Sequence, residues 1–222
     1  MDYGWWVVAH ILAAGYWLGT DLAVYYTAGT IANRKAPTAA RVWAGKTMLL
    51  LDMVPRTCLI LTLAFGLTLA ARAGFLAALA PWLPAIWIGG AAWLALTWSV
   101  FRLEHSALGH RLAQIDFGLR IVIAAGCLHG AWLLWHGTET LARTPWLSLK
   151  LAIIGAIIGL GLVIRMQLKP FGPLFGKAVS GQASAADEDA LARLIAQVKV
   201  PVWAIWIALV AAIALGRIKP YF

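Results

Sequence analysis

The chain has 222 residues, of which 62% are hydrophobic and only 12% carry a charge. A soluble domain has about 25% charged residues, so this chain lacks the polar side chains that a water-facing surface needs, and an ordinary soluble protein is excluded. The net charge of +9 does not indicate binding to nucleic acid, because the basic residues lie in short segments between apolar runs, as they do in loops beside anionic lipid.

Six apolar runs are long enough to cross a membrane, which takes about 20 residues. They are 4–29, 47–71, 82–103, 117–137, 146–167 and 199–217. We therefore predict an all-α fold, an integral membrane bundle of six transmembrane helices that forms a single domain over 1–222. The second run is the least regular, because Asp52, Pro55 and Arg56 interrupt it, and proline usually kinks a membrane helix.

The connections between these runs predict the orientation of the chain. Basic side chains gather in the first, third and fifth connections and are sparse in the second and fourth. The positive-inside rule therefore predicts that the odd connections face the cytoplasm and that both termini lie outside. In the long fifth connection, about 168–198, a Gly/Pro/Ser stretch precedes a short amphipathic helix that is predicted to start near Ser184.

Ionisable residues within the spans are the candidate functional residues, because it is costly to place them in lipid. The first group is His10, His129, His136 and Lys150. A rise of 1.5 Å per residue places His10 and His129 roughly 9–12 Å below the predicted outer surface, on different helices. Lys150 lies in the same outer half, and His136 lies seven residues after His129, nearly at the surface.

Two histidines at one depth suit the two axial positions of a haem b iron, and helix bundles build such sites in their interior. Lys150 would then pair with a haem propionate. Two alternatives stay open. Either these side chains bond to neighbouring helices, or His10 and His129 bind copper or zinc, for which no third soft ligand lies nearby in the sequence.

A second group, Asp21, Asp52 and Arg56, lies in the inner half of the first two spans. Asp52 and Arg56 are four residues apart and share a helix face. This group predicts an ion cluster that ties the first two spans together, and the alternative is a proton route or an acid beside a quinone. A third group lies near the cytoplasmic ends of the third and fourth spans and is predicted to be a solvated loop: Glu104, His105, His110, Asp116 and Arg120.

The first span resembles the first helix of two related membrane families. In the segment VVAHILAAGYWLGTDLAVYYT, a histidine early in the helix is followed by Trp–x–Gly, here His10, Trp17 and Gly19. This pattern is similar to that of the bacterial membrane-bound, haem-b-containing protoporphyrinogen oxidase family and to that of the copper-resistance D family.

Three further segments resemble the oxidase family in particular. LLLDMVPRTCLILTLAFGLTLA is similar to its second helix, and TPWLSLKLAIIGAIIGLGLVIR, with Trp–Leu ahead of Lys150, is similar to its third. ALARLIAQVKVPVWAIWIALVAAIALGRIKPYF, entered through Val–Pro and ended by Lys–Pro, is similar to its last helix. The resemblance covers roughly 1–72 and 145–222.

This resemblance implies haem b with His10 as a ligand, Lys150 acting on the substrate or on haem propionates, and oxidation of protoporphyrinogen IX in the bacterial inner membrane, with electrons passed toward quinone. It also implies that 72–144, which carries the third and fourth spans, is inserted into a four-helix family. A histidine of the family's third helix is absent here, where the chain reads Ile–Gly–Leu at 158–160. We hypothesise that His129 replaces this ligand.

The sequence therefore predicts a membrane-embedded haem b redox protein, an electron-transfer or quinone-linked oxidoreductase in which His10 and His129 bind the iron. Trp17, His136 and Lys150 are expected beside the cofactor. The expected partners are the lipid bilayer, a quinone or porphyrin, and a partner redox subunit or a second copy of the chain. The alternatives are protoporphyrinogen IX oxidation with only His10 on the iron, copper transport or resistance without haem, and a structural role in a larger complex. Whether the chain is an enzyme stays open.

Overall fold

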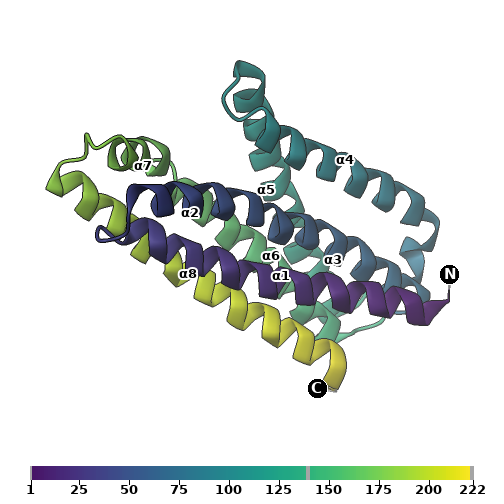
Figure 1. Ribbon diagram of the computed structural model, residues 1–222. Coiled ribbons are helices and arrows are strands. Elements are labelled where there is room, and N and C mark those ends of the chain that lie inside the picture. Colours follow the sequence, from purple (N-terminus) through teal and green to yellow (C-terminus); the bar gives the residue numbers. More distant parts are fainter. Residues whose placement is uncertain (1, 139–140, 221–222) are drawn as a thin grey trace.

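The computed structural model describes residues 2–138 and 141–220, and this part of the chain is all helix and turn, with no β-strand (Figure 1). The helices are α1 (Tyr3–Ala32), α2 (Thr38–Leu51), α3 (Met53–Arg72), the 3-10 helix η1 (Ala77–Trp82), α4 (Leu83–Arg102), α5 (Ala107–His136), α6 (Pro145–Gln167), α7 (Phe171–Val179) and α8 (Ala185–Ile218). Six segments of the described chain are long and apolar enough to cross a membrane, with α2 and α3 together forming one. The predicted all-α membrane bundle is confirmed.

Both ends of the described chain lie at one end of the bundle, which we call the terminal end (Figure 1). The turn between α1 and α2 lies at the opposite end together with α7, and we call this the α7 end. Six crossings of a membrane bring the two termini to the same side. The positive-inside rule predicts that the α7 end faces the cytoplasm.

The packed centre of the bundle is built from α1, α3, α6 and α8. The helix α1 packs chiefly against α3, α2 and α8, whereas α6 packs between α5 and α8. The core between them contains Trp17, Leu59, Ile158, Ile205 and Leu209. The helix α4 packs on α3 and α5 and is tilted away from the centre in Figure 1.

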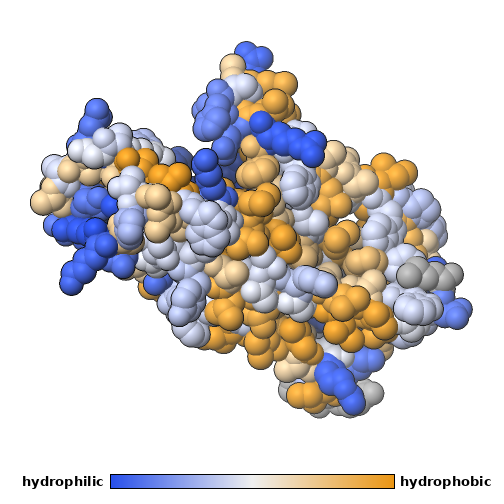
Figure 2. Space-filling view, viewed as in Figure 1, coloured by the Kyte–Doolittle hydropathy of each residue, from blue (hydrophilic) through white to orange (hydrophobic). Residues whose placement is uncertain are grey.

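The surface of the bundle is apolar over most of its height. Figure 2 shows hydrophobic side chains across the middle of the visible face and hydrophilic ones toward its margins. Large side chains such as Tyr26 (81% exposed), Ile88 (71%) and Ile207 (69%) project from it. A monomer in water rarely exposes so continuous an apolar surface, so these side chains face lipid and the chain is a multi-pass membrane protein.

The second span is broken into α2 and α3 at Asp52. Pro55 has no N–H with which to bond the carbonyl group four residues back, so the helix cannot continue unchanged through this turn. The N–H of Asp52 still bonds the carbonyl of Met48 at 2.9 Å, whereas the bond from the N–H of Arg56 to the carbonyl of Asp52 is stretched to 3.5 Å. The predicted interruption therefore falls where the sequence places it.

The last helix differs from the prediction of a short amphipathic helix followed by a separate span. The helix α8 runs unbroken for 34 residues through Pro201. Its start agrees with the prediction, because Ser184 caps it and exchanges hydrogen bonds with Asp187 in a capping box.

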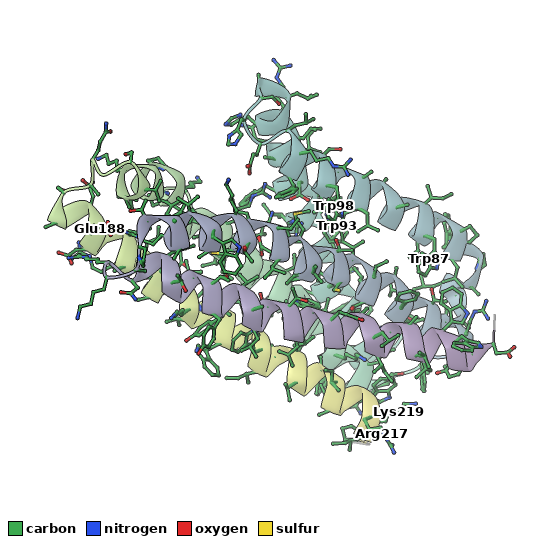
Figure 3. The ribbon with its side chains drawn as sticks, viewed as in Figure 1. Trp87, Trp93, Trp98, Glu188, Arg217 and Lys219 are labelled. Carbon is green, nitrogen blue, oxygen red and sulfur yellow. The ribbon has the colours of Figure 1, made fainter. Side chains whose placement is uncertain are left out.

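At the α7 end, an ion pair joins the second span to the last span. The guanidinium of Arg41 on α2 donates two hydrogen bonds to the carboxylate of Glu188 on α8, at 2.8 and 2.9 Å (Figure 3). The Arg41 side chain is only 6% exposed. Arg34 and Asp189 form a second, exposed pair beside it.

Candidate functional site

His10 lies on the inward face of α1, against α3. Its Nδ1 is buried and has no hydrogen-bond partner among the described residues. The ring is pressed close to α3, because a Cβ on Gly66 would lie 3.2 Å from its Cε1. His10 as a whole is half-buried, and the backbone of Thr62 also lies close to its ring. Its Nδ1 is a nitrogen of the kind that haem iron takes readily.

A cluster of three aromatic rings lies on the side of His10 that faces the terminal end. One turn earlier on α1, the ring of Trp6 lies 5.8 Å from Phe65 on α3 and 5.6 Å from Trp87 on α4. Phe65 and Trp87 are themselves 5.1 Å apart, and Trp87 donates a hydrogen bond to Thr68 (Figure 3). These three rings form an apolar wall next to the histidine.

Lys150 on α6 lies in the same half of the bundle and acts electrostatically on His10. Its Nζ rests on the backbone of α8, so close that a Cβ on Gly216 would lie 2.7 Å from it. Within the described chain, this ammonium group has no carboxylate within ion-pair distance. His10 and Lys150 therefore lie in the same half of the bundle, as the sequence predicts, and no hydrogen bond between them is formed among the described residues.

The structure does not bring His129 to His10. The helix α5 packs chiefly against α4 and α6 and not against α1, and His129 is exposed on its outer surface, stacked on Trp132 at 6.2 Å. His136 is exposed as well, with its Nδ1 2.9 Å from the backbone oxygen of Trp132. The depth of His129 along its helix matches that of His10, but its direction around the helix does not, so the predicted axial pair is not formed.

A metal centre of three or more protein ligands is likewise not assembled in residues 2–138 and 141–220, where no such group of His, Cys, Asp or Glu side chains occurs. The two cysteines, Cys58 and Cys127, are buried and free.

The prediction of a solvated loop near Asp116 and Arg120 is wrong for these two residues. The helix α5 begins at Ala107, ten residues before the predicted span, so both lie within it. Asp116 is 3% exposed, and its carboxylate accepts hydrogen bonds from Arg120 (2.9 Å), from Arg165 on α6 (2.7 Å) and from Trp93 on α4 (3.1 Å; Figure 3). The i, i+4 spacing of Asp116 and Arg120 was the signal in the sequence.

The group of Asp21, Asp52 and Arg56 is close in space but is not the predicted tie between the first two spans. Asp52 and Arg56 pair with each other at the start of α3. Asp21 instead accepts a hydrogen bond from the indole N–H of Trp206 on α8, at 2.7 Å. Asp21 therefore anchors α1 to the last span, whereas Asp52 pairs within the second span.

A cavity of about 420 Å³ opens beside these charges, toward the α7 end. We call it the slot. It lies between α1, α3, α6 and α8, and its charged lining residues are Asp21, Asp52, Arg56, Arg120, Arg165, Lys169 and Lys199. Trp17, expected near a cofactor, is 4% exposed and lines the slot two helical turns from His10. A second, apolar cavity of about 220 Å³ lies between α3, α4 and α5.

Comparison of the chain with protein-family models, with curated proteins and with solved structures gave no match. The residues themselves therefore carry the functional argument. They form two separate polar sites along α1, one at His10 and one at Asp21, about 16 Å apart at 1.5 Å per residue.

Proposed function

We propose that this chain is a membrane-embedded redox protein that binds haem b with His10 as its single protein ligand. The observation that carries the proposal is the buried Nδ1 of His10, which has no hydrogen-bond partner among the described residues, with the ammonium group of Lys150 in the same half of the bundle. A buried polar atom without a partner costs about 1–3 kcal/mol, and an iron ligand bond would remove that cost. The resemblance of the first span to haem-b-containing oxidases supports the same assignment.

On this proposal the chain would offer the haem one histidine ligand, because His129 lies on the outer surface of α5. His10 would hold the iron, and Lys150 would neutralise a propionate in the same half of the membrane. The ring of His10 lies against Gly66 of α3 and lines neither of the two cavities described above, so we expect α1 and α3 to part at Gly66 when haem binds. Haem supplies one-electron redox chemistry when bound, and this chain supplies the ligand, the counter-charge and the apolar wall of Trp6, Phe65 and Trp87.

Oxidation of protoporphyrinogen IX is the form of this activity that we favour over electron transfer alone. Two histidine ligands would fill both axial positions and suit electron transfer, whereas one ligand leaves a position open for reaction. The exposed position of His129 on α5 is the specific observation behind this choice. On this proposal, the chain works in the bacterial inner membrane and passes electrons toward a quinone.

The test is the visible spectrum of the detergent-purified protein, oxidised and dithionite-reduced, with a pyridine haemochrome assay after expression in haem-replete cells. We expect roughly one haem b per chain, lost in His10→Ala and retained in the matched variant His129→Ala. Lys150→Met should lower haem occupancy without abolishing it. A colourless wild-type protein, or haem that survives His10→Ala, would refute the proposal.

If His129→Ala loses the haem as His10→Ala does, the single-ligand proposal fails and the two-histidine form returns. Activity toward protoporphyrinogen IX is measured separately on the haem-loaded protein. An inactive but haem-loaded wild type would leave electron transfer as its function.

A further inference from the structure

The slot is long and narrow. Its lining runs from Trp17 to Ala28 on α1 and from Ile157 to Lys169 on α6, which spans about 16–18 Å at 1.5 Å per residue. A volume of about 420 Å³ over that length is enough to hold one extended apolar chain. The volume falls within the range of about 300–1,000 Å³ typical of small-molecule sites.

The two lysines of the slot lie at one end of it, whereas Asp21 and Arg56 lie within about one helical turn of Trp17 and Leu59. At its inner end, toward the centre of the bundle, the walls are core residues such as Leu59, Ile158 and Ile205. Toward the α7 end lie Arg165 near the end of α6, Lys169 just after it, and Lys199 in α8. A lipid in the leaflet at that end has the same polarity, with its head at the surface and its chain toward the membrane centre.

The charge at this end of the slot is not balanced by the protein. Five cations line the slot as a whole against two carboxylates. Arg56 pairs with one of these, Asp52, and the buried carboxylate of Asp116 is shared by Arg120 and Arg165. Within the described residues, neither Lys169 nor Lys199 forms an ion pair, and Lys199 instead lies 4.4 Å from the ring centroid of Tyr25. Ammonium groups without carboxylate partners bind phosphate, and Arg165, which donates only one of its N–H groups to the shared Asp116, keeps other donors for one.

We propose that the slot binds an amphipathic phosphate, a single extended apolar chain with a phosphate head. The head lies among Arg165, Lys169 and Lys199, and the chain runs toward Trp17. A neutral quinone would fill the apolar part and leave the cations unmatched. This inference does not rest on haem at His10, since His10 does not line the slot.

The experiment titrates the full-length protein, purified in dodecyl maltoside, with dodecyl phosphate and follows tryptophan fluorescence, because Trp17 lines the slot and Trp206 contacts Asp21. Inorganic phosphate tests the head alone, and dodecyltrimethylammonium tests the chain with the opposite charge. The variants are Lys199→Gln, which breaks no ion pair, and Arg165→Gln, and the matched control is Arg111→Gln.

Arg111 is an exposed residue of α5 that does not line the slot, so its substitution removes one positive charge elsewhere. We expect saturable binding of dodecyl phosphate that is unchanged in Arg111→Gln. Lys199→Gln and Arg165→Gln should each weaken the binding about 10-fold, because each removes one charged hydrogen bond to the phosphate. Arg165→Gln also removes a hydrogen bond to Asp116. If Arg165→Gln does not fold, the result with Lys199→Gln alone decides whether the inference holds.

Three results would overturn the inference. Equal binding of the cationic amphiphile would show that the charges do not select the ligand. Binding of inorganic phosphate at the same affinity would show that the apolar slot contributes nothing. An equal loss of affinity in Arg111→Gln would show that dodecyl phosphate responds to overall charge. The haem spectrum is measured on the same samples, so failure here is distinguished from failure at His10.

Discussion

Substitution of Asp116 by Asn should destabilise the bundle more than any other change of one carboxylate to an amide. Three donors from α4, α5 and α6 converge on this carboxylate, and two of them are guanidinium groups. The amide keeps the size of the side chain but removes its charge, which leaves Arg120 and Arg165 without a counter-ion. Removing one partner from a buried ion pair costs about 3–5 kcal/mol.

The lower part of that range, about 3 kcal/mol, is expected because water screens one of the two arginines. The side chain of Arg165 is 31% exposed, whereas that of Arg120 is 12% exposed. The assay is equilibrium unfolding in mixed micelles of dodecyl maltoside and increasing dodecyl sulfate, followed by circular dichroism. The matched control is Glu104→Gln, whose side chain is 43% exposed and which should change stability by less than about 0.5 kcal/mol.

A double substitution tests the physical reason. If the cost of Asp116→Asn arises from uncompensated charge, adding Arg165→Met should recover at least about 1 kcal/mol, a coupling well outside additive behaviour. The reasoning is refuted if Asp116→Asn unfolds within about 1 kcal/mol of wild type. It is equally refuted if the effects of the two substitutions simply add.

Three further predictions concern the ends of the bundle. Arg41→Gln removes a two-fold hydrogen bond to α8 from a side chain that is 6% exposed and should cost about 3 kcal/mol, whereas Arg34→Gln, at 43% exposed, should cost about 1 kcal/mol or less; equal costs in the same unfolding assay would contradict this. Gly109→Ala should prevent the turn between α4 and α5 from forming, because its Cβ would collide with a backbone carbonyl group, while Gly118→Ala, with open space around it, should be neutral or stabilise the helix by up to about 1 kcal/mol. The substitution Lys35→Cys should make the protein react with an impermeant maleimide only from the cytoplasmic side, because the positive-inside rule places this turn there. The two native thiols are buried and should not react. Labelling from outside would reverse the predicted orientation.

The sequence predicted the spans well because length and hydropathy determine them directly. It predicted the break at Asp52 for the same kind of reason, since Pro55 lacks one hydrogen-bond donor whatever surrounds it. The unbroken α8 was not predicted, because a proline inside a membrane helix is tolerated or not according to its neighbours. Pro201 is itself buried among them.

The candidate site was only partly predictable because depth and direction are different quantities. Counting residues gives the height of His10, His129 and Lys150 in the membrane. The direction in which each side chain points depends on how its helix is rotated in the bundle, which is set by packing. The same limit hid Asp116, because the Trp93 and Arg165 side chains that donate to its carboxylate come from other helices, 23 and 49 residues away in the sequence.

The length of α8 has a mechanical consequence. Its 34 residues make a rod about 51 Å long, while the hydrocarbon core of a bilayer is about 30 Å thick. The rod is held by Arg41 through Glu188 at one end, lines the slot near its middle and bears Lys150 on Gly216 at the other end. Because one helix contacts both places, we expect a tilt of α8 to shift the slot lining and Lys150 together. A ligand that tilts α8 at the slot should then change the affinity of a ligand bound near Lys150. By linkage, the second ligand should change the affinity of the first by the same factor.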